Sequence, residues 1–322
     1  MGVIGTGGMG NVHTNHYNKM SDVTVVAWDV DPERLRAFCE RHGAAAASSM
    51  DDLLSRADAV DVCLPTDLHL DVASQAFAAG KHVLVEKPMC GNVADCITLI
   101  ERAEKAGVKV VPGHVVRFFK EFRTGHDLVA SGKIGTPGAA RTRRGGKAPM
   151  GSEGWFRDVK RSGGVLLDLA VHDFDWLRWT LGEVTEVYAR SVALSGTTDA
   201  PGDYALATLK FANGAVAHVE ATWMDPAGTR ATFEVCGSEG MIEFDSRVNN
   251  ALRTTHDGGT FTDNALAGHD DPYFCQLSAA MKTFFEGAKP EVTAHDGLAA
   301  VAIAEACLES AGSGLWVKPR TF

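Results

Sequence analysis

Residues 1–10 read Met-Gly-Val-Ile-Gly-Thr-Gly-Gly-Met-Gly and contain the pattern G-x-G-x-x-G. A short apolar run before the glycines predicts a strand, and a helical pattern follows them. In such a unit Gly5 makes the tight turn, Gly7 lets the backbone approach a diphosphate, and Gly10 lets the helix pack on the strand. The alternative is a glycine-rich turn that binds no ligand. The residues expected at the dinucleotide are Gly5, Thr6, Gly7, Gly8, Met9 and Gly10.

Asp29 supports a ligand at this turn. It lies 19 positions after Gly10, at the predicted end of the second strand, where a carboxylate accepts hydrogen bonds from ribose hydroxyls and repels a 2′-phosphate. The alternative role for Asp29 is a turn or capping carboxylate, because Asp31 and Pro32 directly afterwards form a helix start signal. We therefore expect NAD as the cofactor, with NADP less favoured.

The pattern of the chain changes near residue 113. Before this point, β-branched runs alternate with helical patterns, which predicts a parallel sheet with crossover helices. After a helix at 117–131, strand-like segments follow one another, with the hairpin signal Asn213-Gly214 between two of them, and predict an antiparallel or mixed sheet. The expected strands are 3–4, 23–28, 59–64, 82–85 and 108–111 in the first part, and 184–194, 203–211, 215–223, 229–236 and 240–244 in the second.

The composition is that of an ordinary globular protein. With 322 residues, of which 45% are hydrophobic and 22% charged, the chain is long enough for two domains. Its net charge of −10, from 41 acidic and 31 basic residues, argues against nucleic acid as a partner. We find no secretory leader and no apolar run of the roughly 18 residues that a membrane span needs, so no membrane association is expected.

The cysteines indicate neither disulfides nor a metal site. There are seven, an odd number, and none of them forms a C-x-x-C motif. A disulfide framework would show an even number of cysteines, and a thiolate metal site would show C-x-x-C spacing. We therefore expect no metal ion and a reducing, cytoplasmic location.

The segment 83–88, Val-Leu-Val-Glu-Lys-Pro, places a charged pair directly after a buried strand. Ligands bind at the carboxyl edge of parallel sheets, so we expect Glu86 and Lys87 at this edge. Oxidation of an alcohol needs a base for the hydroxyl proton and a cation or hydrogen-bond donor beside the developing alkoxide. Lys87 can supply the cation beside the developing alkoxide. A solvated lysine after a strand is the alternative.

A second polar group lies in the segment 163–176, which begins with two glycines. In a helix of about 100° per residue, Asp168 and His172 fall on one face and can touch. A buried acid–imidazole pair is costly unless it is satisfied or used, so we expect His172 to act as an acid/base. A satisfied core histidine is the alternative. The opposite, apolar face consists of Leu166, Ala170, Phe174, Leu177 and Leu181.

Taken together, the glycine-rich turn, Glu86-Lys87-Pro88 and the segment 163–176 resemble the Gfo/Idh/MocA family, the glucose–fructose oxidoreductase and inositol dehydrogenase group. The resemblance extends over essentially the whole chain. Further blocks that resemble the family, in the right order, are Pro65-Thr66-Asp67-Leu68-His69, Arg117-Phe118, Trp155-Phe156-Arg157-Asp158 and Asp296-Gly297-Leu298.

This resemblance implies an α/β fold in two domains. A Rossmann dinucleotide-binding domain at 1–119 would be followed by an α+β domain at 120–322, with a large open, mostly antiparallel sheet that forms a subunit interface. It implies a homodimer or homotetramer. The implied activity is an NAD-dependent dehydrogenase that oxidises a secondary hydroxyl of a small sugar, cyclitol or related polyol.

The resemblance also implies residue roles. Lys87 would face the substrate, His172 would accept the hydroxyl proton, and Asp168 would orient His172 and hold the substrate. Arg117 would bind substrate near the junction of the domains, and the Lys87–Pro88 peptide bond would be cis. The residues implied near the cofactor are Pro65, Thr66, His69, Glu86, Lys87, Trp155 and Arg157.

One departure leaves the substrate open. Val116 stands where inositol-handling relatives often have a second arginine. Two other classes of function also stay open. The first is a non-redox NAD-binding regulatory sensor, which would not need the acid/base set of Lys87, Asp168 and His172. The second is a glycosidase or lyase assisted by a retained NAD.

Overall fold

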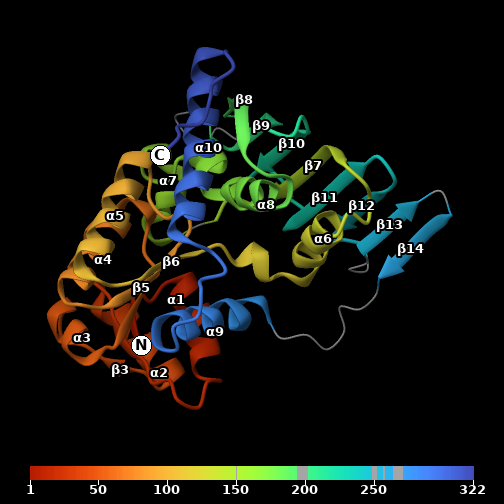
Figure 1. Ribbon diagram of the computed structural model, residues 1–322. Coiled ribbons are helices and arrows are strands. Elements are labelled where there is room, and N and C mark those ends of the chain that lie inside the picture. The colour runs from red at the N-terminus through yellow and green to blue at the C-terminus, as the bar shows by residue number, and fades with distance from the viewer. Residues whose placement is uncertain (150, 194–201, 249–251, 257, 264–270) are drawn as a thin grey trace. The chain divides into compact units, whose positions relative to one another are not determined.

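The computed structural model describes residues 1–149, 151–193, 202–248, 252–256, 258–263 and 271–322. The chain divides into two compact units, named here the first unit and the second unit, and Figure 1 labels their elements. One boundary between the units falls within helix α10 (Ala294–Ser313). The first unit comprises Met1–Val115, Gly151–Glu153 and Asp270–Leu298, and the second comprises Val116–Met150, Gly154–His269 and Ala299–Phe322.

The first unit contains a six-stranded parallel sheet in the order β3-β2-β1-β4-β5-β6. Val3, Val60 and Val83 on its inner strands are fully buried, as in parallel sheets whose two faces are covered. This arrangement confirms the predicted Rossmann-type fold. The second strand begins three residues later than predicted. The strands are β1 (Gly2–Ile4), β2 (Val26–Trp28), β3 (Ala45–Ala46), β4 (Ala59–Val62), β5 (His82–Glu86) and β6 (Val110–Gly113).

Local signals set the ends of the helices in this unit. Asp31 caps α2 by accepting hydrogen bonds from the backbone N–H groups of Glu33 and Arg34, and Gly43 ends it in the left-handed conformation with φ of 67°. The helical elements are α1 (Gly8–Tyr17), α2 (Pro32–His42), α3 (Met50–Arg56), η1 (Thr66–Leu68), α4 (His69–Ala78), α5 (Val93–Ala106) and α9 (Pro272–Phe285).

Helix α9 lies beside α1, although about 255 residues separate them in the sequence (Figure 1). The rings of Tyr273 and His16 stack with centroids 6.2 Å apart, and Leu277 and Phe284 join the core of the first unit. Asp271 caps this helix and Pro272 is its first residue, the same signal that begins α2. Helix α9 was not among the predicted elements and is an addition to the predicted fold.

The second unit contains an eight-stranded sheet in the order β14-β13-β12-β11-β7-β10-β9-β8. All described pairs are antiparallel except β7 with β10, which confirms the predicted mostly antiparallel sheet. Residue 194, the predicted end of one strand, lies outside the described residues. The strands are β7 (Pro137–Gly145), β8 (Val184–Val192), β9 (Tyr204–Phe211), β10 (Val216–Thr222), β11 (Arg230–Gly237), β12 (Met241–Asp245), β13 (Leu252–His256) and β14 (Gly259–Asp263).

Strand β7, in the middle of this sheet, was not predicted. Its sequence is rich in arginine and alanine rather than in β-branched or aromatic residues. Ala140 and Thr142 point into the core, whereas Arg141 and Arg143 point to the opposite face, where Arg143 pairs with Glu220. The ion pairs and the pairing with two neighbouring strands thus stabilise β7 despite its low intrinsic β-propensity.

Helices α6 (Lys120–Ala130) and α8 (Val171–Leu181) lie on one face of the second sheet (Figure 1). Aromatic side chains hold them there. Trp176 of α8 lies 4.7 Å from the ring of Phe233 between centroids and donates from Nε1 to the Phe122 carbonyl at 2.8 Å. A Cβ at Gly125 would come within 2.9 Å of Phe233, so glycine allows this close contact. The helical elements that lie wholly or partly in this unit are η2 (Val115–Phe118), α6, η3 (Ser152–Arg157), α7 (Val159–Ser162), a π-helical turn (Val165–Leu169), α8 and α10.

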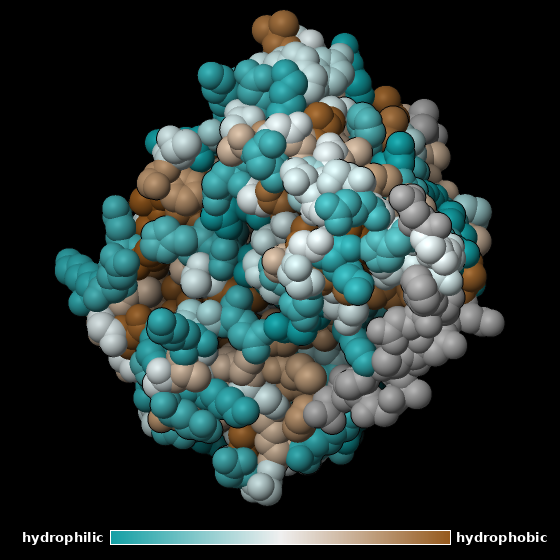
Figure 2. All heavy atoms as spheres, turned by 45° about the vertical axis from the view of Figure 1, so that its right-hand side comes forward, coloured by the Kyte–Doolittle hydropathy of each residue, from teal (hydrophilic) through white to brown (hydrophobic). Residues whose placement is uncertain are grey.

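Hydrophilic side chains cover most of the face shown in Figure 2, with apolar residues interspersed among them. The exposed large apolar residues are distributed along the chain; Val30, Leu206 and Leu315 are examples. Among the described residues, no helix combines the length and the apolar character that crossing a bilayer demands.

Candidate active site

The glycine-rich turn of the first unit has the shape that a diphosphate requires. Gly5 has φ of 92°, and a Cβ at Gly10 would lie 2.2 Å from the Gly5 carbonyl oxygen, so both positions need glycine. Gly7 and Gly8 face open space, with nothing within 4 Å of an added Cβ. Helix α1 has no side-chain N-cap, which leaves its first N–H groups available for an anion. The turn therefore fits a dinucleotide.

Asp29 is fixed beside this turn. Its Oδ2 accepts hydrogen bonds from the Thr6 backbone N–H and the Thr6 hydroxyl, both at 2.8 Å, and its Oδ1 accepts from the Asp31 backbone N–H at 2.9 Å. Arg34 Nη1 lies 3.5 Å from the same Oδ1. An ionised carboxylate offers about four acceptor positions, and three of those on Asp29 are taken by close hydrogen bonds. The fourth faces Arg34 only at 3.5 Å, so a ribose hydroxyl would take the place of this long contact.

His69 connects two loops at the carboxyl edge of the first sheet. Its Nε2 lies 2.9 Å from the Leu64 carbonyl oxygen and its Nδ1 lies 3.0 Å from that of Pro88. The ring is fully buried, and burial lowers the pKa of His69. Thr66, in the loop between β4 and α4, is also buried. His69 therefore supports the loop that carries Lys87.

Glu86 and Lys87 lie at the end of β5, as the sequence predicts. The Glu86 carboxylate is almost completely buried, and its Oε2 accepts a hydrogen bond from the Lys87 backbone N–H at 3.0 Å. The Lys87–Pro88 peptide bond is cis, as expected. Lys87 itself is partly exposed. Glu86 thus fixes the Lys87 backbone from a buried position, whereas the Lys87 residue is partly exposed.

A buried polar cluster beneath the glycine-rich turn was missed by the sequence analysis. His13 Nδ1 of α1 and the Tyr17 hydroxyl both contact Asp61 Oδ2 of β4, at 2.8 and 2.9 Å. The Cys63 thiol donates to Asp61 Oδ1 at 3.3 Å. An aspartate within an otherwise apolar buried strand was the available signal, because such a residue needs buried partners.

Raising the pH above neutrality is expected to destabilise the protein through His13. Burial disfavours the charged ring, but Asp61 and Cys63 raise the pKa of His13 well above its usual value near 6.5. A protonated His13 therefore stabilises the folded protein. This stabilisation is complete below the pKa that His13 has in the unfolded chain and is lost as the pH rises through its pKa in the folded protein. Urea denaturation between about pH 6 and about pH 9 should show a slope of at most about 1.4 kcal/mol per pH unit.

Other groups that face His13 from neighbouring elements are His16 and Tyr17 of α1, Glu86 of β5 and the Tyr273 ring of α9. Because glutamine does not titrate, His13→Gln should remove this part of the pH dependence. An identical slope in the two proteins would show that His13 is not its source.

In the second unit, two glycines lead into the segment that carries Asp168 and His172. Gly163 and Gly164 have φ of 71° and 63°, and a Cβ at Gly164 would lie 2.8 Å from the Cα of Gly202. The Ala170 backbone N–H then donates to the Val165 carbonyl at 2.8 Å, which closes a π-helical turn. The π-helical turn carries Asp168, and the first turn of α8 carries His172.

The predicted uniform α-helix is therefore corrected to a π-helical turn followed by an α-helix. A π turn holds more residues than an α turn, so the angle of about 100° per residue does not apply across Asp168. Asp168 is 4% exposed and His172 is partly buried. All five residues of the predicted apolar face, namely Leu166, Ala170, Phe174, Leu177 and Leu181, are buried.

Two arginines hold the first turns of α8. Arg117 Nε and Nη2 donate to Asp175 at 2.8 and 2.6 Å, and both side chains are nearly inaccessible. Arg144 of β7 donates to Asp173 at 2.8 and 3.3 Å. Burial raises the pKa of Asp173, although Arg144 opposes this shift. Arg117, predicted to bind substrate, thus directs its guanidinium to Asp175.

Trp155 and Arg157 lie in η3 of the second unit. The Trp155 ring is buried and stacks on Phe156 with centroids 3.9 Å apart, whereas Arg157 is exposed. Their predicted place near the cofactor stays a prediction, as does that of Pro65, Thr66 and His69.

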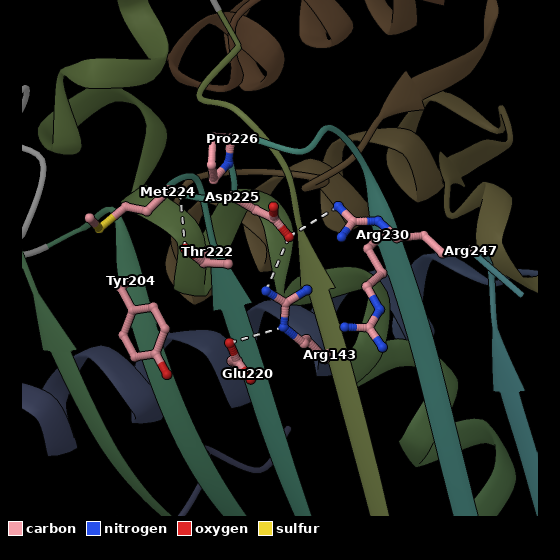
Figure 3. A pocket seen from close by; sticks show the side chains of 9 residues that line it. All are labelled: Arg143, Tyr204, Glu220, Thr222, Met224, Asp225, Pro226, Arg230 and Arg247. Atoms are coloured by element: carbon pink, nitrogen blue, oxygen red, sulfur yellow. Dashed lines mark hydrogen bonds and ion pairs between the residues drawn. The ribbon is translucent and has the colours of Figure 1, made fainter.

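A pocket of about 500 Å³ opens on the second sheet and contains none of the predicted site residues (Figure 3). Its arginines are matched by carboxylates: Arg143 contacts Glu220 and Asp225, and Arg247 also contacts Asp225. These ion pairs balance the charges of Arg143 and Arg247, although Arg143 Nη1 is buried without a hydrogen-bond partner. We assign no catalytic role to the pocket. It is lined by Arg143, Tyr204, Glu220, Thr222, Met224, Asp225, Pro226, Arg230 and Arg247.

Comparison with known families agrees with this geometry. Residues 1–114 match the family model described as an oxidoreductase family with an NAD-binding Rossmann fold, and residues 122–243 match the GFO/IDH/MocA C-terminal domain. The fold and the open glycine turn thus define an NAD-binding oxidoreductase. The chain belongs to the Gfo/Idh/MocA family.

Several relatives cover almost the whole chain. Myo-inositol 2-dehydrogenase of Thermotoga maritima is 31% identical over 322 residues, which are 96% of this chain and 95% of that protein. The 1,5-anhydro-D-fructose reductase of Ensifer adhaerens is 30% identical over 294 residues, 88% of this chain and 86% of that protein. The crystal structure of GenD2 from gentamicin A biosynthesis in complex with NAD has a TM-score of 0.87 at 27% identity and covers 99% of this chain and 96% of that one.

Proposed function

We propose that this oxidoreductase is an NAD-dependent dehydrogenase that oxidises a secondary hydroxyl of a small sugar, cyclitol or related polyol. The observation that carries the proposal is the carboxyl edge of the first unit's sheet, where an open glycine turn follows β1 and a partly exposed Lys87 follows β5, with β4 between the two strands. The names of the two relatives, an inositol dehydrogenase and an anhydrofructose reductase, support a substrate of this class.

Each residue of the proposed site has one task. Lys87 holds the substrate oxygen by charge and hydrogen bonding, and His172 accepts the proton of the hydroxyl. Asp168 orients His172 and contacts the substrate. Bound NAD supplies the acceptor for the hydride. Arg117 fixes the position of α8 through Asp175 with two of its five guanidinium N–H groups, and its contact with the substrate stays a prediction.

The substrate range is expected to extend beyond inositol. Val116, where inositol-handling relatives often have an arginine, is almost completely buried and apolar. It can offer no charge to a polyol hydroxyl. We therefore place the substrate in the wider class of sugars and cyclitols and not in inositol alone.

A screen of the purified protein tests the proposal. Absorbance at 340 nm is followed with NAD, and separately with NADP, against a panel of cyclitols, aldoses and sugar acids. NADH should appear with at least one member. Clear NAD binding without turnover of any member would contradict the dehydrogenase and favour a regulatory sensor. NAD that copurifies and resists dialysis, together with release of sugar, would favour a glycosidase or lyase.

The preference for NAD is expected to depend on the charge of Asp29. Asp29→Asn keeps an acceptor for Thr6 but removes the negative charge that repels a 2′-phosphate. The dissociation constant for NAD should rise about tenfold or more, because a hydrogen bond to a charged group is lost, and that for NADP should fall. Asp31→Asn, a change at the exposed α2 cap, is the control. Equal effects of the two substitutions would contradict the ribose role.

We also propose a cytoplasmic homo-oligomer. All seven cysteines are free thiols, as a reducing compartment favours. The sheet face opposite α6 and α8 carries exposed Leu206 and Val216 among charged residues, and a second copy of the chain could cover it. Light scattering on the wild type and on Leu206→Arg tests this. A monomeric wild type would contradict the proposal.

A further inference from the structure

His13 connects two buried carboxylates in the first unit. On one side its Nδ1 contacts Asp61, and on the other its Nε2 lies 3.3 Å from Glu86 Oε1. The second contact has the separation of an ion pair but not the angle of a well-aligned hydrogen bond. Since Glu86 also binds the Lys87 backbone N–H, a continuous polar chain runs from α1 to the turn that carries Lys87.

The position of the ring indicates its charge. The side chains of His13 and Asp61 are fully buried, and that of Glu86 is 7% exposed. A neutral imidazole has one N–H and would direct its other nitrogen, a lone pair, at a carboxylate oxygen. An imidazolium carries an N–H on both sides and places a positive charge between two buried negative ones. The two flanking carboxylates therefore favour the imidazolium.

We propose that His13, as an imidazolium, is a positioning residue that fixes Glu86, and through it the Lys87 backbone, relative to α1. The helix that begins at the glycine-rich turn and the proposed substrate-facing lysine are thereby held by one side chain. The catalytic importance of this link rests on the proposed function, because displacement of a reacting group by about 1 Å can cost up to about a hundredfold in rate. The polar link between α1 and the turn that carries Lys87 does not depend on the proposed function.

A metal site is the competing interpretation of the same residues. Donor atoms of His13, Asp61 and Cys63 all lie within 4.8 Å of one another. However, Asp61 Oδ2 already accepts hydrogen bonds from His13 and Tyr17 at 2.8 and 2.9 Å. The arrangement fits hydrogen bonds better than coordination.

Two substitutions of His13 test its contacts with Asp61 and with Glu86 separately. In His13→Asn the amide nitrogen falls near the position of Nδ1, so the contact with Asp61 survives and that with Glu86 is lost. In His13→Gln the amide nitrogen falls near Nε2 and can reach Glu86. The matched control is Tyr17→Phe, which removes one hydrogen bond to Asp61 and leaves the Glu86 side intact.

The first measurement is independent of turnover. Hydrogen–deuterium exchange should show faster exchange of the Lys87 amide in His13→Asn, by about tenfold or more, because this amide donates to Glu86. His13→Gln should show a smaller change, and Tyr17→Phe should show none at residues 86–88. General destabilisation would instead accelerate exchange throughout the sheet. NMR of the imidazole should report a protonated His13 ring at neutral pH.

The second measurement uses a substrate found in the 340 nm screen. In His13→Asn, kcat should fall by about tenfold to about a hundredfold, while the dissociation constant for NAD stays within about threefold. Tyr17→Phe should keep kcat within about twofold, since the Glu86 side of the link is intact.

The outcomes separate the two proposals. Unchanged Lys87 exchange in His13→Asn, a neutral His13 ring, or stoichiometric metal in the purified protein would each overturn the positioning role, whatever the turnover. Faster Lys87 exchange in a protein that oxidises no substrate would support the link and contradict the proposed dehydrogenase.

Discussion

Replacing His172 by alanine is expected to lower kcat by two to four orders of magnitude, because proton transfer by a positioned side chain contributes about this much to a reaction. Lys87→Ala should have an effect of similar size, since it removes the cation beside the developing alkoxide. The dissociation constant for NAD should change little in either variant. Steady-state kinetics on the substrate found in the screen, with NAD binding measured separately, checks this.

The controls are a histidine and a lysine away from the proposed site. His218 is exposed on β10 and contacts Thr208, and Lys105 is exposed in the last turn of α5. Their alanine variants should retain nearly full activity. If Lys87→Ala and His172→Ala both kept the turnover of the wild type, the catalytic assignment would be wrong.

Arg117→Ala is expected to reduce the free energy of unfolding by about 3–5 kcal/mol, because it leaves the Asp175 carboxylate buried without its bidentate partner. The pair is almost completely inaccessible, and the Arg117 guanidinium also lies 5.1 Å from the centre of the Trp179 ring. Chemical denaturation of the wild type and the variant measures the difference.

An exposed pair provides the comparison. Arg36 and Glu40 form an ion pair of 3.2 Å on α2 with both side chains more than 60% exposed, so Arg36→Ala should cost less than about 1 kcal/mol. The double variant Arg117→Met with Asp175→Leu should cost less than Arg117→Ala, because no charge is left unpaired. Equal losses in Arg117→Ala and Arg36→Ala would refute the account of the buried pair.

The features that could be predicted from sequence are those that local signals determine. The glycine turn, the Asp31 cap and the apolar strands of the first unit each follow from a few adjacent residues, and the structure confirms them. The five predicted strands of the second unit also match β8 to β12 within about two residues where they are described. Periodicity of apolar residues was sufficient for this part of the fold.

The rest depends on contacts between distant residues. Strand β7 has a weak intrinsic preference and forms because β10 and β11 flank it. The π-helical turn begins where Gly164 approaches Gly202 and the Val165 N–H donates to the Gly202 carbonyl, a contact that no local pattern reveals. Likewise, the engagement of Arg117 with Asp175, 58 residues away, could not be seen in the block that suggested a substrate contact.

The position of α9 has a consequence for how the protein is made. Leu277 and Phe284 complete a core that also contains Val3 and Leu84, so the first unit cannot be finished until most of the polypeptide has left the ribosome. During synthesis the strands of the first unit therefore keep an exposed apolar surface until the second sheet has been translated. Premature termination of translation before residue 272 would therefore release a chain in which even the first part to emerge is incomplete.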